Sequence, residues 1–311
     1  MRVFKQSHCI WFRLLENNNL SPILKWAGGK RRVTHFLSKF CPEVIERYFE
    51  PFLGGGSLFL YLAQTKPRFK AVLSDSNTDL INVYKYVRDD VRGLIAILDI
   101  HQSKYYKNPD KYYYYVRDTY APTKDIENAA RLIFLNRTCY NGLYRVNKSG
   151  FFNVPHGTHL RPTICNSQKL IAFSEILQRS DAEIICDNYR NVIQRCQHSD
   201  VIYLDPPYHP LSKTAYFKDY TKEEFGNLEQ VLLAKEFKRL SNKGCTVLLS
   251  NSSSSFIFDL YQHYNIMTIS TTRQINCDAS NRLRHQELLI TNKRLIAPKS
   301  SANYAQKMSQ M

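Results

Sequence analysis

The chain has 311 residues, of which 43% are hydrophobic and 23% charged, a composition that suits one large domain or a domain with a sizeable insert. Its formal net charge of +16 favours a polyanionic partner, nucleic acid first, although a soluble basic protein with a diffuse field is the alternative. No apolar run approaches the roughly 18 residues of a membrane span, and residues 1–19 lack the apolar core and cleavage site of a secretory signal, so we expect a cytoplasmic protein that does not bind a membrane.

The cysteines show neither a Cys-x-x-Cys pair nor a Cys/His spacing typical of metal ligands. A disulfide framework would be unusual at this length, so they are expected to be the reduced thiols of a cytosolic protein. No metal site is predicted. The eight are Cys9, Cys41, Cys139, Cys165, Cys186, Cys196, Cys245 and Cys277.

After an N-terminal extension, residues 1–20, the first predicted feature is a loop that opens a helix. The pair Gly28-Gly29 is followed by basic residues and then by apolar residues at helical spacing. Such a loop lets the backbone approach a ligand closely. Trp26 can pack on a cofactor and Lys30 can meet a carboxylate there. The alternative is a capped helix start with an exposed lysine.

Residues 47–59 predict a strand, a glycine loop and a helix, and Ala71–Asp75 predicts a second strand that ends on a carboxylate. Asp75 follows Gly54 by roughly 20 residues, the spacing at which nucleotide-binding βαβ units hold a ribose. The glycines do not form the pattern Gly-x-Gly-x-x-Gly. This counts against a bound pyrophosphate and favours a nucleoside that lacks one.

The middle of the chain interrupts this alternation of strands and helices. Residues 77–100 and 126–135 have helical patterns, and the tyrosine-rich, basic stretch 105–115 predicts either a nucleic-acid surface or an amphipathic helix. Two tight turns between residues 140 and 150 then predict a β-hairpin. Arg145 can grip guanine and Asn141 can pair with adenine in a major groove, although a solvated hairpin has the same composition.

The second half predicts strands over residues 182–187, 201–204, 246–251 and 286–292, a helix over 231–240 and a disordered tail from residue 298. The strand Val201–Leu204 ends on Asp205-Pro206-Pro207-Tyr208. In open α/β sheets ligands bind outside the carboxyl ends of strands, so chemistry is expected at this point.

The sequence Asp205-Pro206-Pro207-Tyr208 suits methylation of an exocyclic base amine. Such an amine is a poor nucleophile because its lone pair is delocalised into the ring. The Asp205 carboxylate and the Pro206 carbonyl can accept its hydrogen bonds and free the lone pair, while the two prolines fix the backbone and Tyr208 offers a stacking face. The alternative is a strand followed by an ordinary turn.

Five motifs follow one another in the chain: Lys-Trp-Ala-Gly-Gly-Lys, Glu-Pro-Phe-Leu-Gly-Gly-Gly, Ser-Asp-Ser-Asn, Asn-Arg-Thr-Cys-Tyr-Asn-Gly-Leu-Tyr-Arg and Asp-Pro-Pro-Tyr. In this order they resemble the Dam-type (alpha group) DNA adenine-N6 methyltransferases, close to the GATC-specific enzymes of restriction-modification systems. The resemblance covers about residues 22–292. It implies an α/β fold, with a Rossmann-like class I methyltransferase sheet and an inserted, mainly helical target-recognition domain that carries a β-hairpin.

The resemblance also implies domain limits and residue roles. The limits are an extension (1–20), a catalytic domain in two parts (21–95 and 167–297), the recognition insert (96–166) and a disordered tail (298–311). Contacts to S-adenosylmethionine fall to Trp26, Lys30, Gly54, Gly56, Asp75 and Asp205, and catalysis to Asp205, Pro206, Pro207 and Tyr208. Contacts to DNA fall to Lys25, Tyr140, Asn141, Leu143, Arg145 and Pro155.

Two departures from the family pattern are visible. Residues 1–20 have no clear counterpart, and the glycine-rich stretch common near the end of the family is replaced here by residues 275–281. The implied partners are double-stranded DNA and S-adenosylmethionine. The sequence fits a solitary methylase or one linked to a restriction system. In the second case a cognate endonuclease would act on the same DNA site without binding this protein stably.

Alternatives to adenine methylation remain at this stage. Cytosine-N4 methylation suits the same motif, but relatives that act on cytosine more often carry Ser in place of Asp205. An RNA or protein methyltransferase fits the motif order less well. A catalytically inactive DNA-binding relative is disfavoured, because such a protein would not need the intact residues Lys30, Asp75 and Asp205 to Tyr208. A nicotinamide enzyme is disfavoured because the chain lacks the pattern Gly-x-Gly-x-x-Gly.

Overall fold

The computed structural model describes residues 20–159, 161–211, 225–272 and 284–293. Within these ranges the strands form one seven-stranded sheet in the order β3-β2-β1-β4-β5-β7-β6. Strands β1 to β5 run parallel, and β7 runs antiparallel to both β5 and β6. The strands are β1 (Arg47–Glu50), β2 (Lys70–Asp75), β3 (Glu183–Cys186), β4 (Val201–Leu204), β5 (Thr246–Ser252), β6 (Asn265–Thr272) and β7 (Arg284–Thr291).

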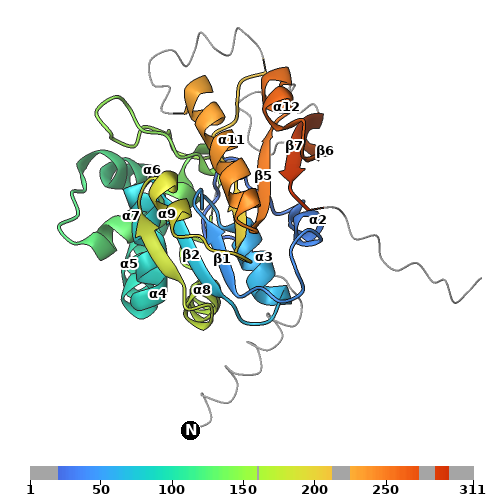
Figure 1. Ribbon diagram of the computed structural model, residues 1–311. Coiled ribbons are helices and arrows are strands. Elements are labelled where there is room, and N and C mark those ends of the chain that lie inside the picture. The colour runs from blue at the N-terminus through green and yellow to red at the C-terminus, as the bar shows by residue number, and fades with distance from the viewer. Residues whose placement is uncertain (1–19, 160, 212–224, 273–283, 294–311) are drawn as a thin grey trace, which may run out of the picture.

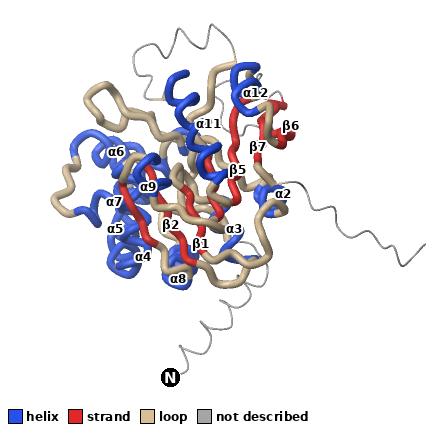
Figure 2. The backbone as a smooth tube through the Cα atoms, in the orientation of Figure 1, coloured by secondary structure: helices blue, strands red, loops and turns tan. Residues whose placement is uncertain are grey.

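Helices cover both faces of the sheet, as Figure 2 shows with the strands in red among blue helices. Among the described residues outside 90–166, the helices are α2 (Thr34–Ser38), α3 (Ser57–Thr65), α4 (Thr78–Asp89), α8 (Ser167–Arg179), α9 (Tyr189–Gln194), α11 (Asn227–Asn242) and α12 (Ser255–Tyr261). No described helix is long and apolar enough to cross a lipid bilayer.

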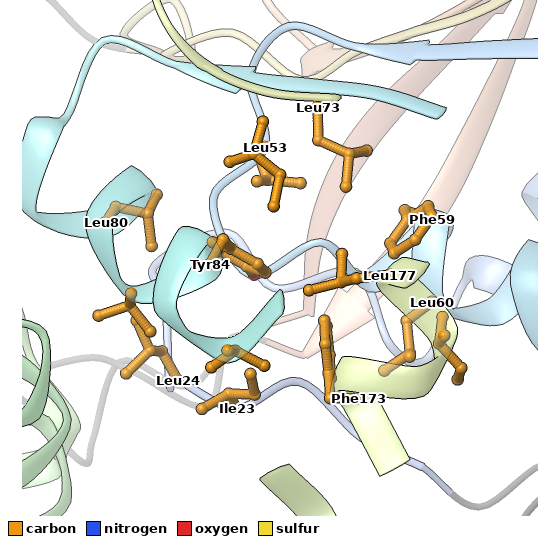
Figure 3. Packing of buried hydrophobic residues seen from close by; sticks show 14 of the residues in the cluster. Ile23, Leu24, Leu53, Phe59, Leu60, Leu73, Leu80, Tyr84, Phe173 and Leu177 are labelled. Carbon is orange, nitrogen blue, oxygen red and sulfur yellow. The ribbon is translucent and has the colours of Figure 1, made fainter. Parts of the chain in front are cut away.

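The side chains of the central strands alternate between two apolar cores because successive residues of a strand point to opposite faces. Tyr48 of β1 and Tyr203 of β4 pack toward α3, α4 and α8, a core that Figure 3 shows from close by. Phe49 and Ile202 pack on the opposite face, toward α9, α11 and α12. Both faces are covered, so β4 is buried at every position.

A mainly helical region lies between β2 and β3 in sequence. Figure 1 shows its green and teal elements gathered beside β2 and β3, at one end of the sheet. It contains α5 (Val91–Lys107), α6 (Pro109–Tyr114), the π-helical turn η1 (Tyr115–Thr119), α7 (Asp125–Thr138) and the 3-10 turn η2 (Tyr140–Gly142). After η2 the chain forms an antiparallel hairpin with the bridges Cys139–His156 and Val146–Phe152. The predicted fold, with its helical insert and hairpin, is confirmed.

Two details of the fold differ from the prediction. The pattern over residues 77–100 is split at Asp90, because its carboxylate accepts the Gly93 N–H and caps the start of α5. Strand β6 was not predicted, although it completes the sheet beside β7.

The predicted limits between the parts of the chain remain predictions. Residue 96 lies inside α5, and Asn166 is the N-cap of α8. The predicted tail, residues 298–311, and residues 1–19 of the extension lie outside the described residues.

Candidate active site

A wide cleft lies at the carboxyl ends of the parallel strands. The strand order reverses between β1 and β4, and this switch point is where open α/β sheets bind ligands. Glu50 ends β1, Asp75 ends β2 and Asp205 follows β4, so three carboxylates meet along the same edge. The cleft has a volume of about 1670 Å³.

The structure brings all the predicted catalytic and cofactor residues to this cleft. Its lining includes Trp26, Lys30, Gly54, Gly56, Asp75, Asp205, Pro206, Pro207 and Tyr208. Of the predicted DNA contacts, Lys25 and Asn141 also line it, whereas Tyr140, Leu143, Arg145 and Pro155 do not.

Lys30 lies between two carboxylates at the centre of the cleft. Its ammonium is 3.2 Å from Asp205 Oδ1 and 3.5 Å from Glu287 Oε2, and the side chain is only 5% exposed. It also donates to the Gly28 carbonyl at 2.9 Å. Burial between two acids excludes the alternative of an exposed lysine at a helix start.

Tyr208 belongs to the same cluster. Its hydroxyl donates to Glu287 Oε2 at 3.2 Å, and Lys30 Nζ lies 4.8 Å from the ring centroid, over one face. This cation–π contact and the hydrogen bond fix the orientation of the ring before any ligand binds.

Asp205 remains able to accept a further hydrogen bond. Its Oδ1 atom is buried and faces the Lys30 ammonium at 3.2 Å, while the side chain as a whole is 19% exposed. Burial raises the pKa of this carboxyl, Lys30 opposes the rise, and the nearby Glu287 adds to it. The exposed part of this carboxylate, held in place by the ion pair with Lys30, suits an incoming N–H group.

The backbone that follows Asp205 is held by a buried amide network. Gln230 of α11 donates to the Pro207 carbonyl at 2.9 Å, and Asn251 of β5 donates to Gln230 Oε1 at 3.0 Å. The N–H of His209 donates to Asn251 Oδ1 at 3.2 Å. The turn after β4 is therefore fixed by side chains from two other elements.

Asp75 binds the backbone of the glycine loop, residues 54–56, through a hydrogen bond. Its Oδ2 accepts the Gly54 N–H at 3.0 Å and its Oδ1 accepts the Asn77 N–H at 3.0 Å. Gly54 has a φ of +46°, and a Cβ there would lie 3.0 Å from Trp26 Cδ1. The absence of a side chain at Gly54 thus lets the indole lie directly on the loop.

Glu50 is a buried acid beneath the cleft. Its Oε2 accepts the Tyr48 hydroxyl at 2.8 Å and the Phe59 N–H at 3.1 Å. Burial raises the pKa of this carboxyl to about 8, against the two hydrogen bonds, and Asp205 adds to the rise. Glu50 is consequently protonated over much of the neutral range.

The hairpin presents polar side chains to solvent. The Arg145 guanidinium donates through Nε to Asn153 Oδ1 at 2.7 Å and through Nη2 to the Asn153 carbonyl at 3.0 Å. Tyr140 and Asn141 are exposed, and Asn141 has a φ of +54° in the tight turn. Pro155 is exposed and its carbonyl accepts the Tyr140 N–H at 2.9 Å, while Leu143 is half-buried.

Glu287, like Glu50, is a cleft residue that the sequence interpretation did not identify. The sequence pattern indicates acids that follow the ends of parallel strands. Strand β7 is antiparallel, so its beginning, and not its end, reaches the edge where the parallel strands end. The pairing of Glu287 with Ser252 at the end of β5 places it there.

In the described part of the chain no three His, Cys, Asp or Glu side chains gather in a way that could hold a metal ion.

Comparison with known proteins identifies the family. Residues 26–275 match the profile of the family described as D12 class N6 adenine-specific DNA methyltransferase. A type II methyltransferase of Lactococcus lactis subsp. cremoris, M1.LlaDCHI, is 38% identical over 286 residues, which cover 90% of this chain and 98% of that protein.

Two further relatives extend this match. The type II methyltransferase M.MjaIII of Methanocaldococcus jannaschii is 38% identical over 288 residues, 88% of this chain and 99% of the relative. A DNA adenine methylase of Serratia marcescens is 33% identical over 268 residues, which cover 86% of this chain and 96% of that protein. Adenine rather than cytosine is the base named by the family description. The chain belongs to the D12 class of N6 adenine-specific DNA methyltransferases.

Proposed function

We propose that this protein transfers a methyl group from S-adenosylmethionine to N6 of adenine in double-stranded DNA, within the sequence GATC. The observation that carries the proposal is the single cleft that joins Asp205-Pro206-Pro207-Tyr208 to Lys30, Asp75 and the glycine loop.

The cleft fits a methyl donor and a base together. Small-molecule pockets commonly have volumes of about 300–1000 Å³, whereas this cleft has about 1670 Å³. The glycine loop allows a close backbone approach, and Asp75 offers carboxylate oxygens for ribose hydroxyls. When bound, S-adenosylmethionine would supply an electrophilic methyl group for in-line attack by the amine.

The residues around Asp205 are suited to hold the amine. Asp205 offers a partly exposed carboxylate held by Lys30, and the turn that carries the Pro206 carbonyl is fixed at Pro207 by Gln230. Hydrogen bonds from N6 to both acceptors would draw its lone pair out of the ring. Lys30 covers one face of Tyr208, so the base would stack on the other face.

The hairpin supplies the proposed recognition of DNA. The net charge of +16 favours attraction to phosphates, with an affinity that falls steeply as salt rises. Arg145 and Asn141 are exposed on the hairpin and can meet base edges in the major groove. The target adenine must leave the stack, because its N6 cannot reach the donor inside the duplex. The GATC assignment rests on the resemblance at Lys25, Tyr140, Asn141, Leu143, Arg145 and Pro155.

A plasmid-protection experiment tests the proposal. Plasmid DNA from a host without adenine methylation is treated with the purified protein and S-adenosylmethionine, then digested with two endonucleases that cut at GATC. One is blocked by N6-methyladenine and the other requires it. We expect protection from the first and cutting by the second, and neither effect with Asp205→Ala.

Nucleoside mass spectrometry of the same DNA separates the other outcomes. N6-methyladenine without a change in digestion would overturn GATC and keep adenine methylation. No methylated nucleoside would identify a catalytically inactive DNA-binding relative. A restriction-linked role further predicts that the source cell contains an endonuclease that the treated plasmid resists, whereas a solitary methylase does not require one.

A further inference from the structure

The loop that carries Lys25 and Trp26 is bound directly to the hairpin region, although more than 100 residues separate them in sequence. Asn136 of α7 is 1% exposed and joins the two. Its Oδ1 accepts the Lys25 N–H at 2.8 Å, and its Nδ2 donates to the Lys25 carbonyl at 2.8 Å and to the Gly142 carbonyl at 3.0 Å. One buried amide thus fixes the backbone on both sides.

A close approach of the two segments strengthens this link. A Cβ atom on Gly142 would lie 2.4 Å from Lys25 Cδ and 2.9 Å from Lys25 Cβ. Gly142 also has a φ of +66°, which other residues rarely adopt. The turn η2 can therefore pack on Lys25 only because residue 142 has no side chain.

An aromatic stack forms a third contact, independent of the first two. The rings of Trp26 and Tyr144 have centroids 4.9 Å apart and an interplanar angle of 28°. The Tyr144 hydroxyl donates to Asp79 Oδ2 at 3.3 Å, in the first turn of α4. Since Trp26 also lies on Gly54, the indole is packed between the hairpin and the glycine loop.

We propose that Tyr144 and Asn136 are positioning residues that couple cofactor binding to DNA recognition. The inference rests on the proposed function, in which the hairpin reads DNA and Trp26 contacts the cofactor. A ligand that stabilises this arrangement of the loop from Lys25 to Lys30 also stabilises the recognition turn, because the contacts described above join them. Each ligand then raises the affinity for the other by the same factor.

Calorimetric titration tests this coupling. S-adenosylhomocysteine, which cannot donate a methyl group, is titrated into the protein with and without a duplex that contains the sequence the enzyme methylates. We expect the duplex to tighten its binding at least about fivefold in the wild type. The affinity for the duplex, measured with and without S-adenosylhomocysteine, should change by the same factor.

Matched substitutions identify the residues responsible. Tyr144→Phe keeps the stack on Trp26 and loses only the hydroxyl, with its contacts to Asp79 and Asn77, so the coupling factor should stay near the wild-type value. Tyr144→Leu removes the stack, and the factor should fall to within about twofold of one. Gly142→Ala separates the turn from Lys25 and should lower the factor as well, which provides a second test if Tyr144→Leu does not fold.

The outcomes separate this inference from the proposed function. Equal affinities for S-adenosylhomocysteine with and without the duplex in the wild type would overturn the coupling. A wild-type factor in folded Tyr144→Leu or Gly142→Ala would overturn the assignment to these contacts. A wild-type protein that binds neither S-adenosylhomocysteine nor DNA would instead contradict the proposed function.

Discussion

The cleft and the hairpin are built in opposite ways. In the cleft, ionisable groups are buried and already paired with other parts of the protein: Lys30 with two acids, Glu50 with two donors, and Asp75 with two backbone N–H groups. In the hairpin, Arg145 is exposed, and its guanidinium bonds to Asn153 within the same hairpin.

This difference follows from what each region has to do under the proposed function. Electrostatic catalysis depends on groups that are oriented before the reaction begins, so that no free energy is needed to reorganise them. Reading a base edge requires donors and acceptors that exchange water for the base. The cleft is therefore preorganised, whereas the hairpin is attached to the rest of the fold through Asn136, Gly142 and Tyr144 and leaves Arg145 exposed.

The strongest test of the preorganised cleft is Asp205→Ala. The change removes the carboxylate proposed to hold the amine and leaves Lys30 paired with Glu287. We expect kcat for methyl transfer to fall at least about 100-fold, the cost of losing one preorganised polar group. Duplex affinity, measured by fluorescence anisotropy, should stay within about threefold of wild type if binding depends mainly on phosphate contacts. A kcat close to the wild-type value would contradict the assignment of Asp205 as a catalytic residue.

The matching test of the hairpin is Arg145→Ala. A bidentate contact to guanine contributes about 1–3 kcal/mol of discrimination, so the preference for the methylated sequence over a one-base variant should fall roughly tenfold or more. Binding to unrelated duplexes should change little. Asn153→Ala, which removes one of the two hydrogen bonds of the guanidinium and keeps the bond to the backbone carbonyl, should produce a smaller loss of the same kind. An equal loss on every sequence would make Arg145 a phosphate contact.

The sequence was sufficient to predict the parts of the fold and site that depend on local patterns. The strand, glycine loop, helix and strand around Gly54 and Asp75 have a fixed spacing, and prolines at 206 and 207 end β4 where predicted. Their convergence in one cleft follows from parallel strands, whose carboxyl ends meet at one edge.

Features that depend on contacts between distant segments were missed. Glu287 lies on an antiparallel strand and Asn136 inside a helix, so neither occupies a position that local pattern marks as functional. Tyr144 is one tyrosine among 21, and only the folded chain shows that it stacks on Trp26. Strand β6 did carry a usable signal, since Ile266, Thr268 and Ile269 are β-branched.

A smaller effect is expected from Glu287→Gln. The amide can still accept from Tyr208, but the ion pair with Lys30 is lost, which should lower kcat by about tenfold. Because Glu287 contributes to the raised pKa of Asp205, its neutralisation should lower that pKa and move the acid limb of the pH–rate profile to lower pH. Gln286→Asn, at an exposed neighbour, is the control and should leave the profile unchanged. An unshifted acid limb in Glu287→Gln would contradict a role for its charge.

The smallest expected effect concerns Glu50 and the pH dependence of stability. Its pKa is raised from 4.5 to about 8 in the folded protein, so the folded state binds more protons than the unfolded state between these values. The free energy of unfolding should therefore fall as pH rises through this window, by at most about 1.4 kcal/mol per pH unit from this group. Glu50→Gln keeps an acceptor for Tyr48 and Phe59 but cannot ionise, so it should lack this contribution. Urea unfolding of both proteins across the window measures the difference, and parallel stability curves would show that Glu50 is ionised in the folded cleft.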